Sequence, residues 1–321
     1  MKVVRTALAL VAGMCMAAGA LAQSYPTKPV LVVVPFPPGG GTDVQARILL
    51  KELTEQLRQV FIIDNRAGAG GLIGAEAVVN APADGYTLLF TTATLAINAT
   101  LFKSSLKFDP VKDLTPVVWV SSTPLVLIVN PGVAAKSVEE LIELARKKPG
   151  VLNASINVPG STSHLAAEMF KQLAGLSFTT VPYKGGGLSM MAVLSGEVNF
   201  QFAEGLLAGP QIKAGKVRGL AVTTLKPSAA FPDLPMMNAI LPGFVADNWF
   251  AMYFPAATPK EIVGTINAGI RKALEADAVR KLFEQDALIP VGGTPEELGA
   301  HLKREIDRYA EVIRKGNITI Q

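Results

Sequence analysis

The sequence predicts an α/β fold of two lobes, each built on a parallel sheet covered by helices. Apolar, β-branched runs alternate with segments of helical spacing along most of the chain, and the alternation begins a second time near its middle. Such repetition is typical of parallel sheets with helices on their faces. The length of 321 residues agrees with two domains of ~150 residues each.

The first series of elements begins with an almost wholly apolar run, which is typical of a buried strand. Apolar residues at helical spacing follow it, and Pro124 separates the last two strands. The expected order is strand 30–36, helix 42–57, strand 60–63, helix 72–79, strand 86–91, short helix or loop 94–101, and strands 117–121 and 125–129.

The second series begins at Ser137, where a capping box predicts a helix start, and Gly175 predicts a helix end. The expected order is helix 137–148, strand 153–158, helix 163–174, strand 178–183, helix 188–194, strand 198–203, helix 207–214 and strand 217–223. A proline-rich stretch and a further strand, 249–254, lead into a helical tail. The tail is expected to contain helices 259–276, 278–285 and 294–315, with a short strand at 287–291.

The helical tail lacks a sheet of its own, so we expect it to pack on the first lobe. Lobe 1 would then comprise residues 23–122 and 250–321, and lobe 2 residues 123–249. The chain would cross between the lobes near Thr123 and Asn248. Ligands of open α/β sheets bind beyond the carboxyl ends of the strands. The sequence therefore predicts a ligand cleft between the lobes.

Residues 1–22 have the pattern of a secretory signal peptide. Lys2 and Arg5 form a positive start, an apolar run follows at 7–21, and small residues precede the expected cleavage site after Ala22. The apolar run is shorter than the ~20 residues of a spanning helix, which favours a cleaved signal over a membrane anchor. We therefore expect an exported protein.

The composition excludes several classes of function. The only cysteine, Cys15, lies inside the signal, and the residue before it, Met14, is not the small residue of a lipoprotein signal. Charged residues make up 17%, and no basic run is longer than residues 146–148, so a nucleic-acid partner is not expected. No HExxH, paired-cysteine or GxSxG motif is present. We expect neither a catalytic residue nor a metal or cofactor.

A glycine-rich loop follows the first strand. Gly39, Gly40 and Gly41 lead into Thr42 and Asp43, either of which can cap the following helix. Glycines let the backbone approach a ligand closely, and the free N–H groups of a helix start bind anions. The loop lacks the Lys-Ser/Thr pair of a phosphate-binding loop. An anion site and an ordinary glycine-rich turn both fit this segment alone.

A second loop of the same kind follows strand 153–158. Ser161, Thr162, Ser163 and His164 supply hydroxyls and helix-start amides, with Thr162 or Ser163 expected as the N-cap. An ordinary cap would also explain the segment. Because each loop follows a strand of its own lobe, both can face one cleft, where two helix N-termini would hold a carboxylate.

Four further positions and one more glycine-rich segment are candidates. Lys184 could contact a second carboxylate or be solvated, Glu204 could bind an amine, orient water or cap a helix, and His164 could contact ligand or pack. His301 is expected to be solvated on a polar helix. Residues 68–74 approximate a dinucleotide-binding motif with the third glycine one position late, and we interpret them as a close-packed helix start.

Seven segments, in this order, resemble the solute-binding receptors of the tripartite tricarboxylate transporter family, also called Bug proteins. Together they extend over nearly the whole chain. They are VPFPPGGGTD (34–43), DNRAGAGG (64–71), DGYT (84–87), GSTSHL (160–165), VPYKG (181–185), GLAVT (219–223), and a tryptophan with PAATP (249–259).

The resemblance implies a type II periplasmic-binding-protein fold that closes on a small carboxylate. It implies a periplasmic, monomeric receptor that delivers its ligand to membrane permease subunits; a sensing role without a permease, or an exported α/β enzyme, are the alternatives. The ligand-binding residues that it implies are Gly40, Gly41, Thr42, Asp43, Thr91, Thr92, Ser161, Thr162 and Ser163. The chain departs from the family pattern at Pro37-Pro38, at 225–227 and 235–240, and at Glu204, where aspartate is common.

Overall fold

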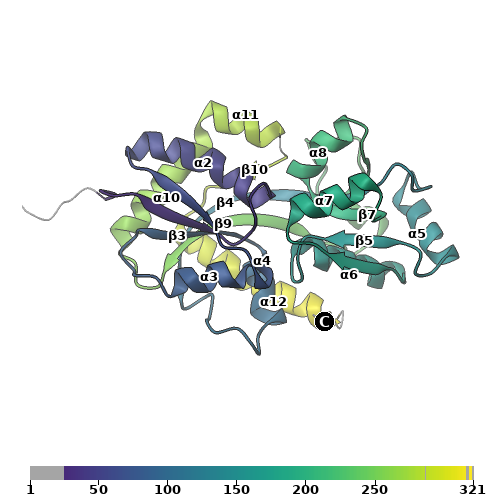
Figure 1. The fold of residues 1–321 in the computed structure, drawn as a ribbon, viewed down its shortest axis with the longest axis horizontal. Helices are drawn as coiled ribbons and strands as arrows, with labels where there is room; N and C mark the ends of the chain where they lie inside the picture. Colours follow the sequence, from purple (N-terminus) through teal and green to yellow (C-terminus); the bar gives the residue numbers. More distant parts are fainter. Residues whose placement is uncertain (1–24, 286, 316–317, 320–321) are drawn as a thin grey trace, which may run out of the picture.

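The computed structural model describes residues 25–285, 287–315 and 318–319. The predicted signal peptide, residues 1–22, lies outside these described residues. Two α/β lobes lie side by side, and two long strands run from one into the other (Figure 1).

The sheet of the first lobe combines parallel and antiparallel strands. Its parallel part is β2-β1-β3, and β9 pairs antiparallel with both β3 and β4, while β10 pairs antiparallel with β4. Its strands are β1 (Val30–Val34), β2 (Phe61–Asn65), β3 (Thr87–Thr92), β4 (Leu114–Val129), β9 (Asp247–Pro255) and β10 (Ile289–Pro290).

The sheet of the second lobe begins where β4 leaves the first. Residues 125–129 of β4 pair antiparallel with β7, and residues 126–129 also pair antiparallel with β8. Strand β5 runs parallel to both β6 and β7. Its further strands are β5 (Asn153–Ile156), β6 (Thr179–Pro182), β7 (Phe200–Glu204) and β8 (Arg218–Val222).

The strand β4 corrects one expectation of the sequence. We expected two strands separated by Pro124, but β4 is one strand of 16 residues. Proline lacks an N–H to donate to a sheet, and here it stands where the strand changes partners: Pro124 is opposite Asp247 of β9, and Leu125 is opposite Glu204 of β7. The antiparallel strands β4 and β9 thus join the two lobes, a feature that an all-parallel arrangement lacks.

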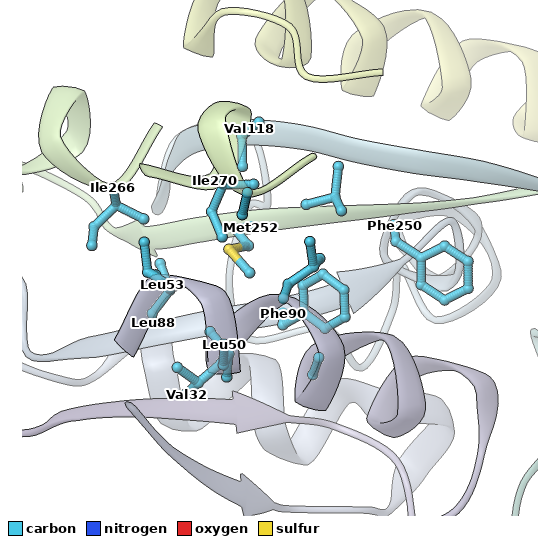
Figure 2. Packing of buried hydrophobic residues seen from close by; sticks show 14 of the residues in the cluster. Val32, Leu50, Leu53, Leu88, Phe90, Val118, Phe250, Met252, Ile266 and Ile270 are labelled. Atoms are coloured by element: carbon cyan, nitrogen blue, oxygen red, sulfur yellow. The ribbon is translucent and has the colours of Figure 1, made fainter. Parts of the chain in front are cut away.

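Helices cover both faces of the first sheet. One face packs on α2 (Gly41–Leu57), α10 (Lys260–Glu275) and α11 (Asp277–Gln285). Figure 2 shows this core, in which Leu50 and Leu53 of α2 gather with residues of the sheet and of α10. The other face packs on α3 (Leu72–Val79), α4 (Thr94–Leu101) and α12 (Pro295–Lys315), with the short η1 (Ala69–Gly71) before α3. In α2, α10 and α12, apolar residues three or four positions apart place one apolar stripe of the helix on the sheet.

Helices also cover both faces of the second sheet. One face packs on α5 (Val138–Lys147) and α6 (Thr162–Ala174), the other on α7 (Gly186–Ser195) and α8 (Gly205–Lys213). The short α9 (Met237–Ile240) follows β8. The predicted helix start is confirmed, because Ser137 is the N-cap of α5 and its Oγ accepts from Glu140 N at 3.2 Å. The Glu140 side chain differs from a capping box in accepting from Lys136 N, at 2.7 Å, instead of from Ser137 N. Gly175 ends α6 in the left-handed conformation, as predicted.

In the part of the chain that the structure describes, no helix combines the length and apolar character needed to cross a bilayer.

Candidate functional site

A small cavity of about 60 Å³ lies between the two lobes. Its walls come from the segments that follow the carboxyl ends of β1 and β3 in the first lobe and of β5, β6 and β7 in the second. It is lined by Phe36, Pro37, Pro38, Gly40, Gly41, Thr42, Thr92, Thr94, Asn157, Val158, Ser161, Thr162, Lys184, Gly185, Gly186, Gly187, Leu188, Glu204 and Asn248. The space suffices for a few water molecules.

Eight of the twelve predicted site residues line this cavity: Gly40, Gly41, Thr42, Thr92, Ser161, Thr162, Lys184 and Glu204. The other four, Asp43, Thr91, Ser163 and His164, are buried but lie outside the cavity lining. Loops that are far apart in the sequence therefore meet at one place.

The N-termini of five helices converge on the cavity. The N-cap or first residue of α2, α4, α6, α7 and α8 each belongs to its lining. The first N–H groups of a helix lack partners within the helix, and the start of a helix carries roughly +0.5 elementary charge. Among the described lining residues Lys184 is the one cation, and it is exposed. The positive partial charges that face the cavity thus come mainly from backbone dipoles.

The glycine loop of the first lobe leaves the start of α2 without a side-chain cap. We expected Thr42 or Asp43 to cap this helix, but Gly40 is the N-cap residue and makes no side-chain hydrogen bond. The carboxylate of Asp43 instead accepts from Gly39 N at 3.0 Å and from the side chains of Arg47 and Asn65. Asp43 therefore braces the loop from behind, and the amides of α2 remain available.

The surroundings of Asp43 also set its charge. Burial alone would raise the pKa of this carboxyl, but hydrogen bonds from Arg47, Gly39 and Asn65 hold the pKa below its ordinary value. Asp43 is thus ionised at neutral pH and fully hydrogen-bonded.

The serine-rich loop of the second lobe caps its helix one residue earlier than expected. The expected caps were Thr162 or Ser163, but Ser161 is the N-cap, and its Oγ accepts from His164 N at 3.3 Å. The backbone of Ser161 is extended, so the helix begins at Thr162. Ser163 Oγ accepts from Asn157 N at 2.9 Å and lies 2.9 Å from Ser161 Oγ, which fixes the loop internally. Ser161 and Thr162, the N-cap and the first residue of α6, both line the cavity.

His164 lies beside a different hollow of the surface, with Glu168 and Lys171. Its Nδ1 accepts from Gly160 N at 3.2 Å, and burial lowers its pKa. A neutral imidazole in this place holds the turn at Gly160, whose φ of +76° favours glycine.

The third strand brings its threonines to the cavity unequally. Thr92 Oγ1 donates to Thr94 Oγ1 at 2.9 Å and accepts from Thr94 N at 3.2 Å, and both residues line the cavity. Thr91 is buried but does not belong to the cavity lining, in keeping with the alternation of side chains along a strand. Thr94 was not among the predicted site residues, although its place directly after a strand end is the same signal.

Glu204 and two asparagines form the buried floor of the cavity. Glu204 Oε1 accepts from Asn248 Nδ2 at 3.2 Å and from Asn157 Nδ2 at 3.5 Å. Glu204 is the residue before α8 but makes no capping hydrogen bond. Burial raises the pKa of this carboxyl to about 7, against the lowering effect of the hydrogen bond from Asn248.

The sequence reasoning missed both asparagines. Asn157 directly follows β5, and Asn248 stands where the chain crosses between the lobes. A polar side chain at a strand end near a crossing point is the signal that would have found them.

The lobes touch each other across the cavity. A Cβ on Gly41 would overlap Glu204 Oε2 and lie 2.9 Å from Leu206, and a Cβ on Gly185 would lie 3.3 Å from Pro37. These contacts join residues of opposite lobes, so glycine at position 41 is required for the close approach.

Two further expectations concern residues away from the cavity. The interpretation of residues 68–74 as a close-packed helix start is confirmed, because Gly74 packs on Pro35 and Gly70 O accepts from Asn98 Nδ2 at 2.8 Å. The expectation that His301 is solvated is wrong. His301 is 7% exposed and stacks on Trp119 at 3.7 Å between ring centroids, because α12 turns this side toward the core. Burial lowers its pKa to about 4.

Within the described residues, no group of three or more His, Cys, Asp or Glu side chains is arranged to hold a metal ion.

Fold and site together define a two-lobed solute-binding protein, and comparison with known proteins identifies the family. The chain belongs to the TctC family, described as tripartite tricarboxylate transporter family receptor, whose sequence model matches residues 45–318. This confirms the family resemblance drawn from the seven sequence segments.

Individual relatives agree with this assignment. The chain is 37% identical to Protein BugT of Bordetella pertussis, over 93% of this chain and 92% of that protein. Among solved structures it resembles R. palustris Rpa4515 with adipate, with a TM-score of 0.89 and 35% identity over 92% of this chain and 99% of that one. It also resembles MatC (Rpa3494) from Rhodopseudomonas palustris with bound malate, with a TM-score of 0.85 and 30% identity over 90% and 100% of the two chains.

These likenesses confirm the predicted fold class of periplasmic binding proteins, with mixed instead of purely parallel sheets. The family consists of periplasmic solute-binding receptors, and small carboxylates are bound in two of its structures.

Proposed function

We propose that this protein is a monomeric periplasmic receptor that captures a small organic carboxylate between its lobes and delivers it to the permease subunits of a tripartite transporter. One observation carries the proposal: five helix N-termini, contributed by both lobes, converge on one cavity. Such N-termini attract anions without any buried cation. The adipate and malate bound by two relatives are carboxylates, which supports the same ligand class.

The recognition that we propose uses backbone amides and hydroxyls. Gly40, Gly41 and Thr42 would offer the start of α2, and Ser161 and Thr162 the start of α6. Thr92 would add a hydroxyl, and the exposed Lys184 a charge at the rim. Asp43, Thr91, Ser163 and His164 would act indirectly, by holding the two loops in place.

Binding would require the lobes to separate and close again. The cavity of about 60 Å³ holds only a few waters, which is too little for a dicarboxylate to enter as it stands. We propose that residues 23–122 with 250–321 move as one body against 123–249. The change of sheet partners at Pro124, opposite Asp247, supports a hinge there.

Thermal unfolding of residues 23–321 with a panel of mono-, di- and tricarboxylates, amino acids and sugars tests the proposal. A ligand at 100 times its Kd adds ~2.7 kcal/mol to the free energy of unfolding. We expect at least one carboxylate to stabilise the protein without being chemically converted. Stabilisation by a sugar, with no effect of any carboxylate, would contradict the proposal.

A further inference from the structure

Two buried acceptor atoms on the floor of the cavity have no hydrogen-bond partner. They are Glu204 Oε2 and Asn248 Oδ1. Both residues line the cavity, with 6% and 2% of their surfaces exposed. Buried polar atoms without partners are uncommon in folded proteins, and each costs free energy unless something satisfies it.

No donor of the described residues reaches either of these two atoms. Asn157 and Asn248 each donate one amide N–H to Glu204 Oε1, and Asn157 Oδ1 accepts from Gln201 Nε2 at 2.9 Å. Turning the Asn248 amide over would place its oxygen against the Glu204 carboxylate, so the carboxylate fixes the orientation in which Oδ1 is free. When the Glu204 carboxyl is ionised, the floor therefore presents acceptors only.

The helix starts present hydrogen-bond donors to a ligand, whereas the floor of the cavity presents acceptors. The starts of α2 and α6 present N–H donors, which match a carboxylate. A carboxylate has no hydrogen to offer Glu204 Oε2 or Asn248 Oδ1, whereas an ammonium carries three N–H bonds and a primary amide two. One ligand can satisfy both sets only if it carries two kinds of group.

We infer that the ligand bears, besides its carboxylate, an N–H donor group, either an ammonium or a primary amide, which Glu204 and Asn248 recognise on the floor of the cavity. This inference rests on the proposed function and names the ligand class within it: amino acids and half-amides of dicarboxylic acids. Glu204 is then the residue that distinguishes these ligands from plain dicarboxylates. Burial raises the pKa of the Glu204 carboxyl, as expected for a buried acid with one oxygen that no donor reaches.

Isothermal titration calorimetry with matched ligands tests the inference on residues 23–321. The panel pairs each dicarboxylate with acids of the same carbon number in which an aminomethyl group or a primary amide replaces one carboxylate, or in which an ammonium is added to the chain. The sets are succinate with 4-aminobutanoate, succinamate and aspartate; glutarate with 5-aminopentanoate, glutaramate and glutamate; and adipate with 6-aminohexanoate and adipamate. We expect the tightest ligand to carry the N–H group and to bind at least roughly tenfold tighter than its dicarboxylate partner.

The variant Glu204→Gln adds a second readout. It removes the negative charge but keeps one acceptor oxygen, so an ammonium ligand should lose roughly tenfold in affinity while an amide ligand loses less. Glu143→Gln on the exposed surface of α5 is the matched control, and should leave all affinities unchanged. The ligand panel on the unaltered protein decides the question even where the variant fails to fold.

The outcomes separate the two proposals. Equal or tighter binding of plain dicarboxylates, with their preference unaltered by Glu204→Gln, overturns the inference and leaves carboxylate capture standing. Failure of every carboxylate in the panel overturns the proposed function and the inference with it.

Discussion

Two buried carboxyls lie on opposite sides of the cavity, and they contrast in almost every respect. Asp43 of the first lobe accepts hydrogen bonds from a backbone amide, Arg47 and Asn65, and its pKa is lowered. Glu204 of the second lobe accepts two amide bonds on one oxygen and none on the other, and its pKa is raised. The Asp43 carboxylate holds the glycine loop in place, whereas Glu204 keeps one oxygen that can accept a hydrogen bond from a ligand.

The contrast extends to the helix starts beside these carboxyls. The first loop is glycine and leaves α2 uncapped, while the second loop caps α6 with Ser161. The first loop thus leaves helix-start amides without a side-chain cap, whereas the second loop adds serine and threonine hydroxyls. Substitutions on the two sides should therefore have different and partly opposite effects.

The largest expected effect is that of Gly41→Ala on ligand affinity. The new methyl would collide with Glu204 and Leu206 of the other lobe, and we expect affinity to fall roughly 100-fold because overpacking costs ~1–3 kcal/mol. Calorimetric titration measures it. The matched control is Gly40→Ala, where a Cβ meets only Pro37 O at 3.6 Å and φ is −79°. Equal losses in the two variants would show that lobe contact at Gly41 is not the cause.

The next effect is a gain of stability in ligand-free Glu204→Gln. The folded pKa of about 7 lies above the ordinary 4.5, so wild-type stability from this group is fully present below pH 4.5 and is lost as pH rises through 7. The variant cannot titrate and should exceed wild type by up to about 3 kcal/mol at pH 8. Urea unfolding at pH 4.5 and pH 8 measures the difference, with Glu143→Gln as control. A stability difference that does not grow from pH 4.5 to pH 8 would contradict a raised pKa of Glu204 in the folded protein.

Asp43→Asn should have the opposite sign. Losing the carboxylate weakens the bonds to Gly39 and Arg47, and we expect a loss of about 2 kcal/mol at pH 7, discounted for the exposed Arg47. Because the folded pKa is below 3.8, this contribution is present above pH 3.8 and is lost as pH falls through the folded pKa. Urea unfolding against the exposed control Asp233→Asn checks it. Stabilisation by Asp43→Asn would remove the contrast between the two acids.

The smallest effect concerns the hydroxyl of the second loop. Thr162→Val keeps the shape of the side chain and removes its hydroxyl, and we expect roughly fivefold weaker carboxylate binding, about 1 kcal/mol, with an unchanged melting temperature. Thr54→Val on α2, outside the cavity lining, is the control in the same titration. An unaltered affinity would mean that the second lobe binds through its amides alone.

The sequence predicted those features that depend on residue type and local position. Glycines after a strand, a serine-rich helix start and apolar periodicity revealed both loops and most elements. Direction of strands is not encoded in an apolar run, so the antiparallel β4 and β9 were missed, as was the continuity of β4 through Pro124.

The floor of the cavity shows a second limit of sequence reasoning. The bonds among Asn157, Glu204 and Asn248 join residues 44 and 47 positions apart, and only the folded chain brings them together. His301 was misjudged for a related reason: its burial depends on Trp119, from a strand far away in the sequence. Local patterns predict elements, whereas such partners depend on topology.

A crystal structure of residues 23–321 with the tightest-binding carboxylate would show whether both helix starts bind the ligand. We expect carboxylate oxygens within ~2.7–3.2 Å of backbone N–H groups at the starts of both α2 and α6, in the cavity lined by Gly41 and Thr162. A carboxylate bound instead in the hollow beside His164 and Lys171, or held by Lys184 without contact to either helix start, would contradict it.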